Sequence, residues 1–290
     1  MIILETLVES GRTLTPEAEE QLVRFFRALS LRTTPLLLLD YDGTLAGFRV
    51  NRFEAVPWAG IRPLLNRIQR QGRTRMAVVT GRPAAEIAPL LALDEPIEVW
   101  GLHGAERIYI DGRHEMEVAS PGAQQKLDQL RELLRRNSFG GLFEDKPNAA
   151  VMHWRGLPPH KAHSVERRTR ELFEPLAELD GLNLLEFEAG VELRVGRDKG
   201  GAVEAILAET CAVEANVDPS SADESSADAP VAYLGDDLTD ESAFRAVNSS
   251  GRPSLSVLMR HHWRPTDANL WLQPPAELKI FLEKWLAALA

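Results

Sequence analysis

The chain has 290 residues, of which 44% are hydrophobic and 26% charged, and it carries a formal net charge of −10. This length and composition allow one large domain or two modest ones with sizeable cores. The acidic charge disfavours nucleic acid and anionic membrane surfaces as partners, and no apolar stretch approaches the ~20 residues of a membrane span.

Residues 1–33 are predicted to form an N-terminal helical appendage. Thr15, Pro16 and Glu17 combine a capping hydroxyl, a proline suited to the first helical position and an acid in the first turn. Apolar residues then recur at helical spacing, namely Leu22, Phe25, Phe26 and Leu29. The pattern indicates a helix that serves packing.

The next segment alternates strands and helices. Residues 36–39 and 76–79 are uninterrupted apolar runs, which is typical of strands buried on both faces of a parallel sheet. Helical patterns cover residues 62–71 and 84–91, and residues 98–100 form a third short strand. This alternation predicts an α/β fold with a doubly wound parallel sheet.

The pattern changes between residues 108 and 196. Hairpins are predicted around Asp111-Gly112 and around Ala189-Gly190, because turn residues there separate short strand-like runs. Between them, helices are predicted over residues 124–136 and 160–179, and a further strand over residues 149–154. We expect a small α+β module here, inserted into the α/β domain.

The chain returns to the α/β pattern after residue 197. A helix is predicted over residues 199–209, strands over 231–234 and 254–258, and a closing helix over 277–289. Residues 213–230 hold four serines, five acids and no basic residue, which predicts a solvated loop. The α/β core is therefore expected to comprise residues 34–107 and 197–290.

Three predicted strands end in reactive side chains: Asp40 with Asp42, Thr80, and Asp236 with Asp237. Ligands of open α/β sheets bind beyond the carboxyl ends of the strands. Carboxylates gathered there repel one another unless a cation joins them, and oxygen ligands suit a hard cation such as Mg²⁺.

The same residues indicate a mechanism. Asp40 could attack phosphorus as a nucleophile, and Asp42 could protonate the leaving oxygen and later activate water. Thr80 could hold phosphate oxygens, and Lys199 could supply a nearby positive charge. Taken singly, each motif has a plainer interpretation as a turn, a calcium loop or a helix start; their joint order favours the chemical interpretation.

That order resembles the haloacid dehalogenase (HAD) superfamily of phosphohydrolases, which carries D-x-D-G-T, a Ser or Thr, a Lys and G-D-D-x-x-D after successive elements. The resemblance implies a HAD-like core with an inserted cap domain at 108–196. It implies Asp40 as nucleophile and Asp42 as acid/base. It also implies Mg²⁺ held by Asp40, the backbone carbonyl of Asp42 and Asp236, with Asp237 and Asp240 as further ligands or neighbours.

A narrower resemblance, from about residue 35 to the C-terminus, is to the trehalose-6-phosphate phosphatase family. It is carried by residues 101–106 (G-x-H-G-x-E), 144–146 (E-x-K), 153–155, 190–194 and 235–241 (G-D-D-x-T-D-E). It implies that the cap binds sugar hydroxyls through Glu144, Lys146 and Glu192. Further expected substrate contacts are Gly81, Arg82, His103, Glu106, Arg155 and Arg194. Without the resemblance, the cap charges would be interpreted as ordinary surface ion pairs.

The expected activity is Mg²⁺-dependent hydrolysis of a sugar phosphate, with trehalose 6-phosphate as the first candidate. Alternatives are a phosphatase for glucosylglycerol or mannosylglycerate phosphate, a phosphoglucomutase-type enzyme, or a non-catalytic phosphosugar-binding regulator. No synthase domain is evident, so coupling to sugar-phosphate synthesis would need a separate synthase. The single cysteine, Cys211, and the absence of a signal-peptide pattern in the first residues lead us to expect a cytoplasmic location.

Overall fold

The computed structural model describes residues 16–31, 33–136, 140–146, 148–177, 181–215 and 229–290. The chain divides into two compact units. Unit 1 takes the chain up to His114 together with Lys199–Asp236 and Asp240–Ala290, and unit 2 takes Glu115–Asp198 with Asp237–Thr239. The breaks at residues 114 and 198 lie a few residues later than the sequence-based boundaries at 107 and 196.

Within the described residues, unit 1 contains an eight-stranded sheet in the order β12-β11-β10-β1-β2-β3-β4-β5. The strands from β12 to β3 run parallel, and β4 pairs antiparallel with β3. The strand bounds are Leu36–Leu39 (β1), Arg75–Val79 (β2), Glu98–Gly101 (β3), Glu106–Ile108 (β4), His114–Met116 (β5), Val231–Gly235 (β10), Ser254–Met259 (β11) and Leu270–Leu272 (β12).

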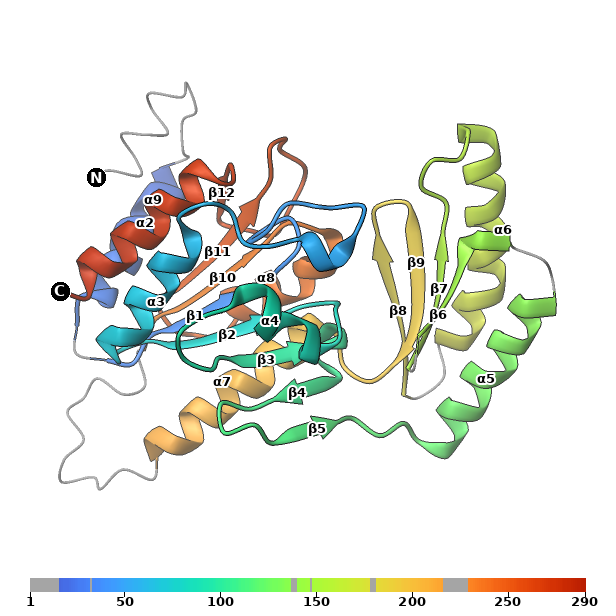
Figure 1. The fold of residues 1–290 in the computed structure, drawn as a ribbon, viewed down its shortest axis with the longest axis horizontal. Helices are drawn as coiled ribbons and strands as arrows, with labels where there is room; N and C mark the ends of the chain where they lie inside the picture. Colours follow the sequence, from blue (N-terminus) through green and yellow to red (C-terminus); the bar gives the residue numbers. More distant parts are fainter. Residues whose placement is uncertain (1–15, 32, 137–139, 147, 178–180, 216–228) are drawn as a thin grey trace. The chain divides into compact units, whose positions relative to one another are not determined.

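Helices cover both faces of this sheet (Figure 1). Their bounds are Pro16–Leu29 (α2), Ile61–Gln71 (α3), Ile87–Leu91 (α4), Lys199–Ala215 (α7), Glu241–Asn248 (α8) and Ala276–Ala288 (α9). Short 3₁₀ turns lie at Arg52–Glu54 (η1), Ala84–Glu86 (η2), Leu102–Gly104 (η3) and Leu238–Asp240 (η6). The doubly wound α/β prediction is confirmed.

Strand β1 shows why its apolar run is uninterrupted. Side chains alternate between the two faces of a strand. Leu37 and Leu39 join the hydrophobic cluster that includes residues of α2, α3 and α9, whereas Leu36 and Leu38 join the cluster that includes α7 and α8. All four leucines are fully buried, so the strand needs apolar residues at every position.

The N-terminal helix α2 is built into the core. Leu22, Phe25, Phe26 and Leu29 are buried, as their helical spacing predicts. Phe25 packs against Trp285 of α9 with a ring-centroid distance of 5.9 Å. The segment expected to be an appendage therefore covers one face of the sheet, at least from residue 16 onward.

Two predicted boundaries differ from the structure for physical reasons. The hairpin of β4 and β5, expected to open the inserted module, instead extends the core sheet, because β4 pairs with β3. Helix α7 continues to Ala215, where the sequence suggested a loop from residue 213, since Ala212 and Ala215 are strong helix formers. The remainder of that predicted loop, residues 216–228, lies outside the described residues.

Unit 2 is an antiparallel sheet in the order β6-β7-β9-β8, with Phe143–Lys146 (β6), Ala149–His153 (β7), Leu182–Phe187 (β8) and Gly190–Val195 (β9). Helices α5 (Pro121–Arg136) and α6 (Pro159–Ala177) share one hydrophobic cluster with it, and a 3₁₀ turn lies at Gly140–Leu142 (η4). Val191, Leu193 and Val195 belong to that cluster, so β9 turns these alternate residues toward the helices.

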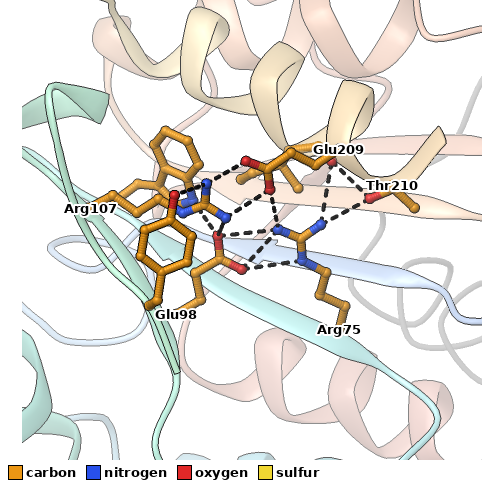
Figure 2. A network of polar contacts seen from close by, with 8 residues as sticks. Arg75, Glu98, Arg107, Glu209 and Thr210 are labelled. Atoms are coloured by element: carbon orange, nitrogen blue, oxygen red, sulfur yellow. Dashed lines mark hydrogen bonds and ion pairs between the residues drawn. The ribbon is translucent and has the colours of Figure 1, made fainter. Parts of the chain in front are cut away.

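A partly buried ion network joins the sheet of unit 1 to helix α7 (Figure 2). Arg107 lies 2.6 Å from Glu98 and also pairs with Glu209 of α7. Arg75 pairs with the same two carboxylates, at 3.0 and 3.1 Å, and donates to Thr210. The Arg107 guanidinium also lies 4.4 Å and 3.8 Å from the ring centroids of Trp100 and Tyr109. The network thus pairs two guanidiniums with two carboxylates.

Candidate active site

Two neighbouring strand ends bring the first acids together. Asp40 follows β1 and Asp236 follows β10, and these strands pair in parallel register with Leu39 beside Leu234. The backbone N–H of Asp40 donates to the carbonyl of Leu234 at 2.8 Å, which continues the ladder to the site. Both acids therefore follow neighbouring strands in the interior of the sheet of unit 1.

Asp240 completes a cluster of three buried carboxylates. Among the described residues, Asp40, Asp236 and Asp240 offer ligand oxygens that all lie within 4.8 Å of one another. Gly235 and Gly43 make room for them: a Cβ on Gly235 would lie 2.3 Å from the Asp240 carboxyl carbon, and one on Gly43 would lie 2.0 Å from an Asp236 oxygen. The glycines of both motifs are thus required by close packing of the acids.

Lys199, the first residue of α7, lies between two of the acids. Its Nζ donates to Oδ1 of Asp40 and to Oδ1 of Asp240, both at 2.7 Å. Burial lowers the pKa of the Lys199 ammonium, but attraction to Asp240 and Asp40 outweighs burial and raises the pKa above its usual range. Lys199 is therefore a permanent cation in contact with the expected nucleophile.

The crowding of buried acids changes the pKa of the Asp40 carboxyl. Burial raises its pKa from 3.8 to about 7, although attraction to Lys199 opposes that change and repulsion from Asp240 adds to it. Asp40 and Asp240 contact the same ammonium, and repulsion between the two carboxylates opposes the ionisation of both. A divalent cation would offset this repulsion, and the converging carboxylate oxygens of Asp40, Asp236 and Asp240 fit one.

Asp240 differs from the other two acids in how its oxygens are used. Oδ1 accepts from Lys199 and from the Tyr233 hydroxyl at 2.6 Å, and Oδ2 accepts from the backbone N–H of Asp236 at 3.0 Å. These three donors leave little capacity for a metal ion. Asp240 therefore orients Lys199 and the turn at Asp236, and Asp40 and Asp236 are the better candidates for direct ligation.

Thr80 is buried and directly follows β2, the strand that pairs with β1 on the side opposite β10. Its hydroxyl accepts from the backbone N–H of Arg82 at 3.2 Å, and its carbonyl accepts from the N–H of His103. Gly81 lies against the His103 ring, since a Cβ there would lie 2.6 Å from Nε2. The Thr80-Gly81-Arg82 turn is thus held closely against the segment that contains His103.

His103 and Glu106, expected to contact substrate, have structural partners in unit 1. His103 has a φ of 58°, in the left-handed region that costs free energy for a residue with a side chain. Glu106 accepts from the backbone N–H of Ala84 at 2.6 Å and contacts His114 at 3.0 Å. Their contact with substrate stays a prediction, while their bracing of β4, η3 and η2 is evident.

Asp42 and Arg82 contact each other in a way that the sequence did not reveal. The carboxylate of Asp42 lies outside the acidic cluster and accepts from Nε and Nη2 of Arg82 at 2.5 and 2.6 Å. Arg82, expected to bind substrate, therefore binds the proposed acid/base. Asp237 also lies outside the cluster of described carboxylates, so a role as metal ligand finds no support in its position.

The helix-free face of the unit 2 sheet gathers the expected sugar-binding residues. Its register places alternate positions of β6, β7 and β9 on this face: Glu144, Lys146, His153, Glu192 and Arg194. Lys146 donates to Glu192 at 2.9 Å, and His153 lies 2.9 Å from Glu144. Arg155 lies past the end of β7, where it donates to the carbonyl of Glu188.

The charges on this face differ in exposure. The Arg194 side chain is fully buried beside Glu192, and burial lowers the pKa of its guanidinium. The side chains of Glu144 and His153 are 44% and 39% exposed. Arg194 therefore supports Glu192 from within, and Glu144, Lys146 and His153 are the more accessible groups.

Comparison with known proteins places this arrangement in a family. The family model described as trehalose-phosphatase matches residues 38–275. The chain belongs to the trehalose-phosphatase family. It is 28% identical over 258 residues to a trehalose-phosphate phosphatase of Mycobacterium marinum, a match that covers 85% of this chain and 60% of the relative. It is also 28% identical over 221 residues to the trehalose-6-phosphate phosphatase of Escherichia coli, covering 75% of each.

Solved structures agree on the fold of this trehalose-phosphatase family member. The C-terminal domain of a C. albicans trehalose-6-phosphate phosphatase superposes with a TM-score of 0.73 at 19% identity, covering 93% of this chain and 98% of that one. The chain spans about 60% of the length of the M. marinum relative. No helix in the described part of the chain is long and apolar enough to cross a membrane.

Sequence reasoning missed two members of the site in this trehalose-phosphatase family member. Tyr233 was interpreted only as a strand residue, yet its hydroxyl holds Asp240. His153 was part of a quoted motif without a role, yet it lies on the same face as Glu144. His153 could have been found from strand alternation, since it lies two positions before Arg155, a residue already expected to contact substrate. No alternation relates Tyr233 to Asp240, which lies seven positions later in the turn after β10.

Proposed function

We propose that this chain is a Mg²⁺-dependent phosphatase that hydrolyses trehalose 6-phosphate to trehalose and phosphate through an aspartyl-phosphate on Asp40. The observation that carries the proposal is the contact of the Lys199 ammonium with buried Asp40 at the end of β1, beside Asp236 at the end of the neighbouring strand β10. Family membership supports the phosphatase class.

Asp40, Asp236 and the backbone carbonyl of Asp42 are the groups that would hold Mg²⁺. When bound, Mg²⁺ would neutralise charge on the phosphate oxygens and align the phosphate with the nucleophile. The convergence of buried ligand oxygens from Asp40, Asp236 and Asp240 within 4.8 Å supports this assignment. The choice of Mg²⁺ over another hard divalent cation rests on ligand chemistry and resemblance.

The residues of the chain account for the first half of the reaction. An Asp40 oxygen attacks phosphorus, and a new O–P bond forms as the bond to the sugar oxygen breaks. Asp42, in its protonated form, gives its proton to that leaving oxygen. Lys199 keeps Asp40 oriented, and Thr80 with neighbouring N–H groups would hold the phosphoryl oxygens.

The second half reverses the roles. The Asp42 carboxylate takes a proton from water as the water oxygen bonds to phosphorus. The O–P bond to Asp40 then breaks, which releases inorganic phosphate and restores the free carboxylate of Asp40. Each proton and each bond is thereby accounted for by Asp40, Asp42, water and the ester.

Sugar recognition is assigned to the charged face of unit 2. Charged groups that each form several hydrogen bonds suit a sugar with many hydroxyls. Glu144 and Lys146 alternate along β6, and Lys146 is positioned by Glu192 of β9 at 2.9 Å. We propose these three as the groups that contact sugar hydroxyls, with unit 2 acting as the cap for substrate recognition.

A substrate panel tests this proposal. Phosphate release would be measured for trehalose 6-phosphate, glucosylglycerol phosphate, mannosylglycerate phosphate and glucose 6-phosphate with Mg²⁺ present. We expect kcat/KM for trehalose 6-phosphate to exceed the others by at least about tenfold, corresponding to roughly 1.4 kcal/mol. A higher value for another glycoside phosphate would reassign the substrate, and transfer of phosphate to a second sugar would indicate a mutase.

A matched pair of variants tests the role of the unit 2 face. Lys146→Ala should raise KM for trehalose 6-phosphate about tenfold or more. Arg167→Gln removes an exposed ion pair with Glu171 on α6 of the same unit and should leave KM unchanged. Equal KM values in both variants would remove Lys146 from the substrate site. Coupling to a separate synthase and a cytoplasmic location remain predictions from the sequence.

A further inference from the structure

The contact between Arg82 and Asp42 has the geometry of a two-pronged fork. Nε of Arg82 donates to Oδ2 of Asp42 at 2.5 Å, and Nη2 donates to Oδ1 at 2.6 Å. Two parallel charge-assisted hydrogen bonds determine the orientation of a carboxylate as well as its position. Attraction and hydrogen bonding to Asp42 raise the pKa of Arg82 above its usual range, so this cation is permanent.

Arg82 is itself held from several directions. Its Nη1 donates to the carbonyl of Arg52 at 2.7 Å and lies 3.7 Å from Glu86. The guanidinium lies 5.4 Å from the ring centre of Tyr41. The Arg82 side chain is 9% exposed, against 28% for Asp42. The arginine is therefore the anchored partner, and Asp42 is the partner whose orientation depends on the contact.

The position of Arg82 in the chain strengthens this relation. Its backbone N–H donates to the hydroxyl of Thr80, the proposed phosphate-binding residue at the end of β2. One short turn thus connects the proposed phosphate-binding hydroxyl to the proposed proton donor. Because both act on the same phosphate ester, their separation matters for the geometry of the transition state.

We propose that Arg82 is a positioning residue for Asp42, and that it acts on the reaction through Asp42 without binding the substrate phosphate. This inference rests on the proposed function, since it assumes that Asp42 is the acid/base. A lysine cannot reproduce the effect, because an ammonium is a point charge without the planar fork. Arg82 therefore sets where the proton of the leaving group is delivered.

The first test compares Arg82→Gln and Arg82→Lys with wild type on two substrates. For trehalose 6-phosphate, kcat should fall about 30- to 300-fold in Arg82→Gln and about tenfold or more in Arg82→Lys, with KM within about threefold. For p-nitrophenyl phosphate, whose leaving group departs without a proton, formation of the aspartyl-phosphate does not need Asp42, so the rate of the initial burst of p-nitrophenol should fall by less than about fivefold. A purely structural role would lower this burst rate as much as kcat for trehalose 6-phosphate, and a substrate-binding role would raise KM.

The matched control is Arg70→Gln. Arg70 forms a 2.7 Å pair with Asp94 in the same unit, but both side chains are more than half exposed and neither contacts Asp42. Its kinetics should equal those of wild type for both substrates. Melting temperatures of all variants verify folding, and Arg82→Lys, which keeps the buried positive charge, serves if Arg82→Gln does not fold.

The decisive test combines Arg82→Gln, or Arg82→Lys if the former does not fold, with Asp42→Asn. If Arg82 acts through Asp42, the double variant should be no slower than Asp42→Asn alone, within about threefold. Multiplicative losses, or a rise in KM on losing Arg82, would overturn the inference while leaving the proposed function intact. Full activity of Asp42→Asn alone would instead overturn the acid/base assignment in the proposed function.

Discussion

Two charge clusters lie at opposite ends of the strands in unit 1, and they differ in how cations and carboxylates are matched. Beyond the carboxyl ends, one ammonium, that of Lys199, contacts two buried carboxylates, those of Asp40 and Asp240. At the starting ends of β2 and β3, two guanidiniums contact two carboxylates (Figure 2). We call the first the acidic cluster and the second, with two cations for two acids, the balanced network.

The pKa values record this difference. In the balanced network, hydrogen bonding to Arg107 lowers the pKa of Glu209, which is the usual effect of a cation on a carboxylate. In the acidic cluster, burial raises the pKa of Asp40 to about 7 even with Lys199 in contact. In the balanced network, two guanidiniums match two carboxylates. In the acidic cluster, one ammonium contacts two carboxylates, so a divalent cation that also binds an anionic substrate would be stabilising there.

The largest expected effect comes from unbalancing the acidic cluster further. Lys199→Met removes the ammonium that contacts both Asp40 and Asp240, so these buried carboxylates lose that partner. We expect a loss of about 3–5 kcal/mol in the free energy of unfolding of the metal-free protein, and loss of phosphatase activity. Chemical denaturation measures the first. A stability equal to wild type would show that Lys199 does not hold the acids.

The pH dependence of stability should distinguish Asp40 from an ordinary carboxylate. Its pKa of about 7 in the folded chain exceeds its unfolded value of 3.8, so its contribution is complete below pH ~4 and is lost as pH rises to about 7. Metal-free Asp40→Asn should therefore be about 2–4 kcal/mol more stable than wild type at pH 8, with no advantage at pH 4. Denaturation at both pH values measures this difference.

Mg²⁺ serves as the control for that prediction. If Mg²⁺ offsets the repulsion among the acids, it should stabilise wild type and should reduce the difference in unfolding free energy between wild type and Asp40→Asn at pH 8. A difference in unfolding free energy that depends on neither pH nor Mg²⁺ would show that the charge of Asp40 does not destabilise the metal-free fold.

Breaking the balanced network should affect stability alone. Glu98→Gln removes one of two carboxylates that face Arg75 and Arg107, while Glu209 remains. We expect a loss of about 2–3 kcal/mol in unfolding free energy, with kcat and KM within twofold of wild type. A large fall in kcat with normal folding would show that this end of the sheet takes part in catalysis.

The smallest effect is expected at an exposed pair. Arg70 and Asp94 lie 2.7 Å apart, but their side chains are 66% and 54% exposed. Arg70→Gln should change the unfolding free energy by less than about 0.5 kcal/mol, since solvent screens such pairs. A loss comparable to that of Glu98→Gln would show that burial does not govern the difference between these clusters.

The sequence predicted the acidic site better than the balanced network for a physical reason. Asp40 and Asp236 directly follow apolar strands, and parallel strands bring their carboxyl ends together whatever the rest of the chain does. Arg75 and Glu209 are separated by 134 residues and lie on a strand and a helix, so no local pattern relates them. Long-range side-chain pairing requires the packed structure.

The same limit applies to Arg82. The resemblance implied a substrate contact, which stays a prediction, whereas the contact with Asp42, 40 residues away at another strand end, had no local signal. The sequence predicted that Arg82 lies at the site, but it did not predict that Arg82 pairs with Asp42. The residues of the unit 2 face were grouped by resemblance, and it is the register of β6, β7 and β9 that brings them onto one face.

The most direct test of the account is phosphate release from trehalose 6-phosphate by wild type and Asp40→Asn, each assayed with Mg²⁺ and with a chelator. Asn keeps the size of the side chain and removes the nucleophilic carboxylate. We expect activity from wild type with Mg²⁺ only, and a fall of about 10³-fold or more in Asp40→Asn. Undiminished Mg²⁺-dependent release by folded Asp40→Asn would contradict the assignment of Asp40 as the nucleophile.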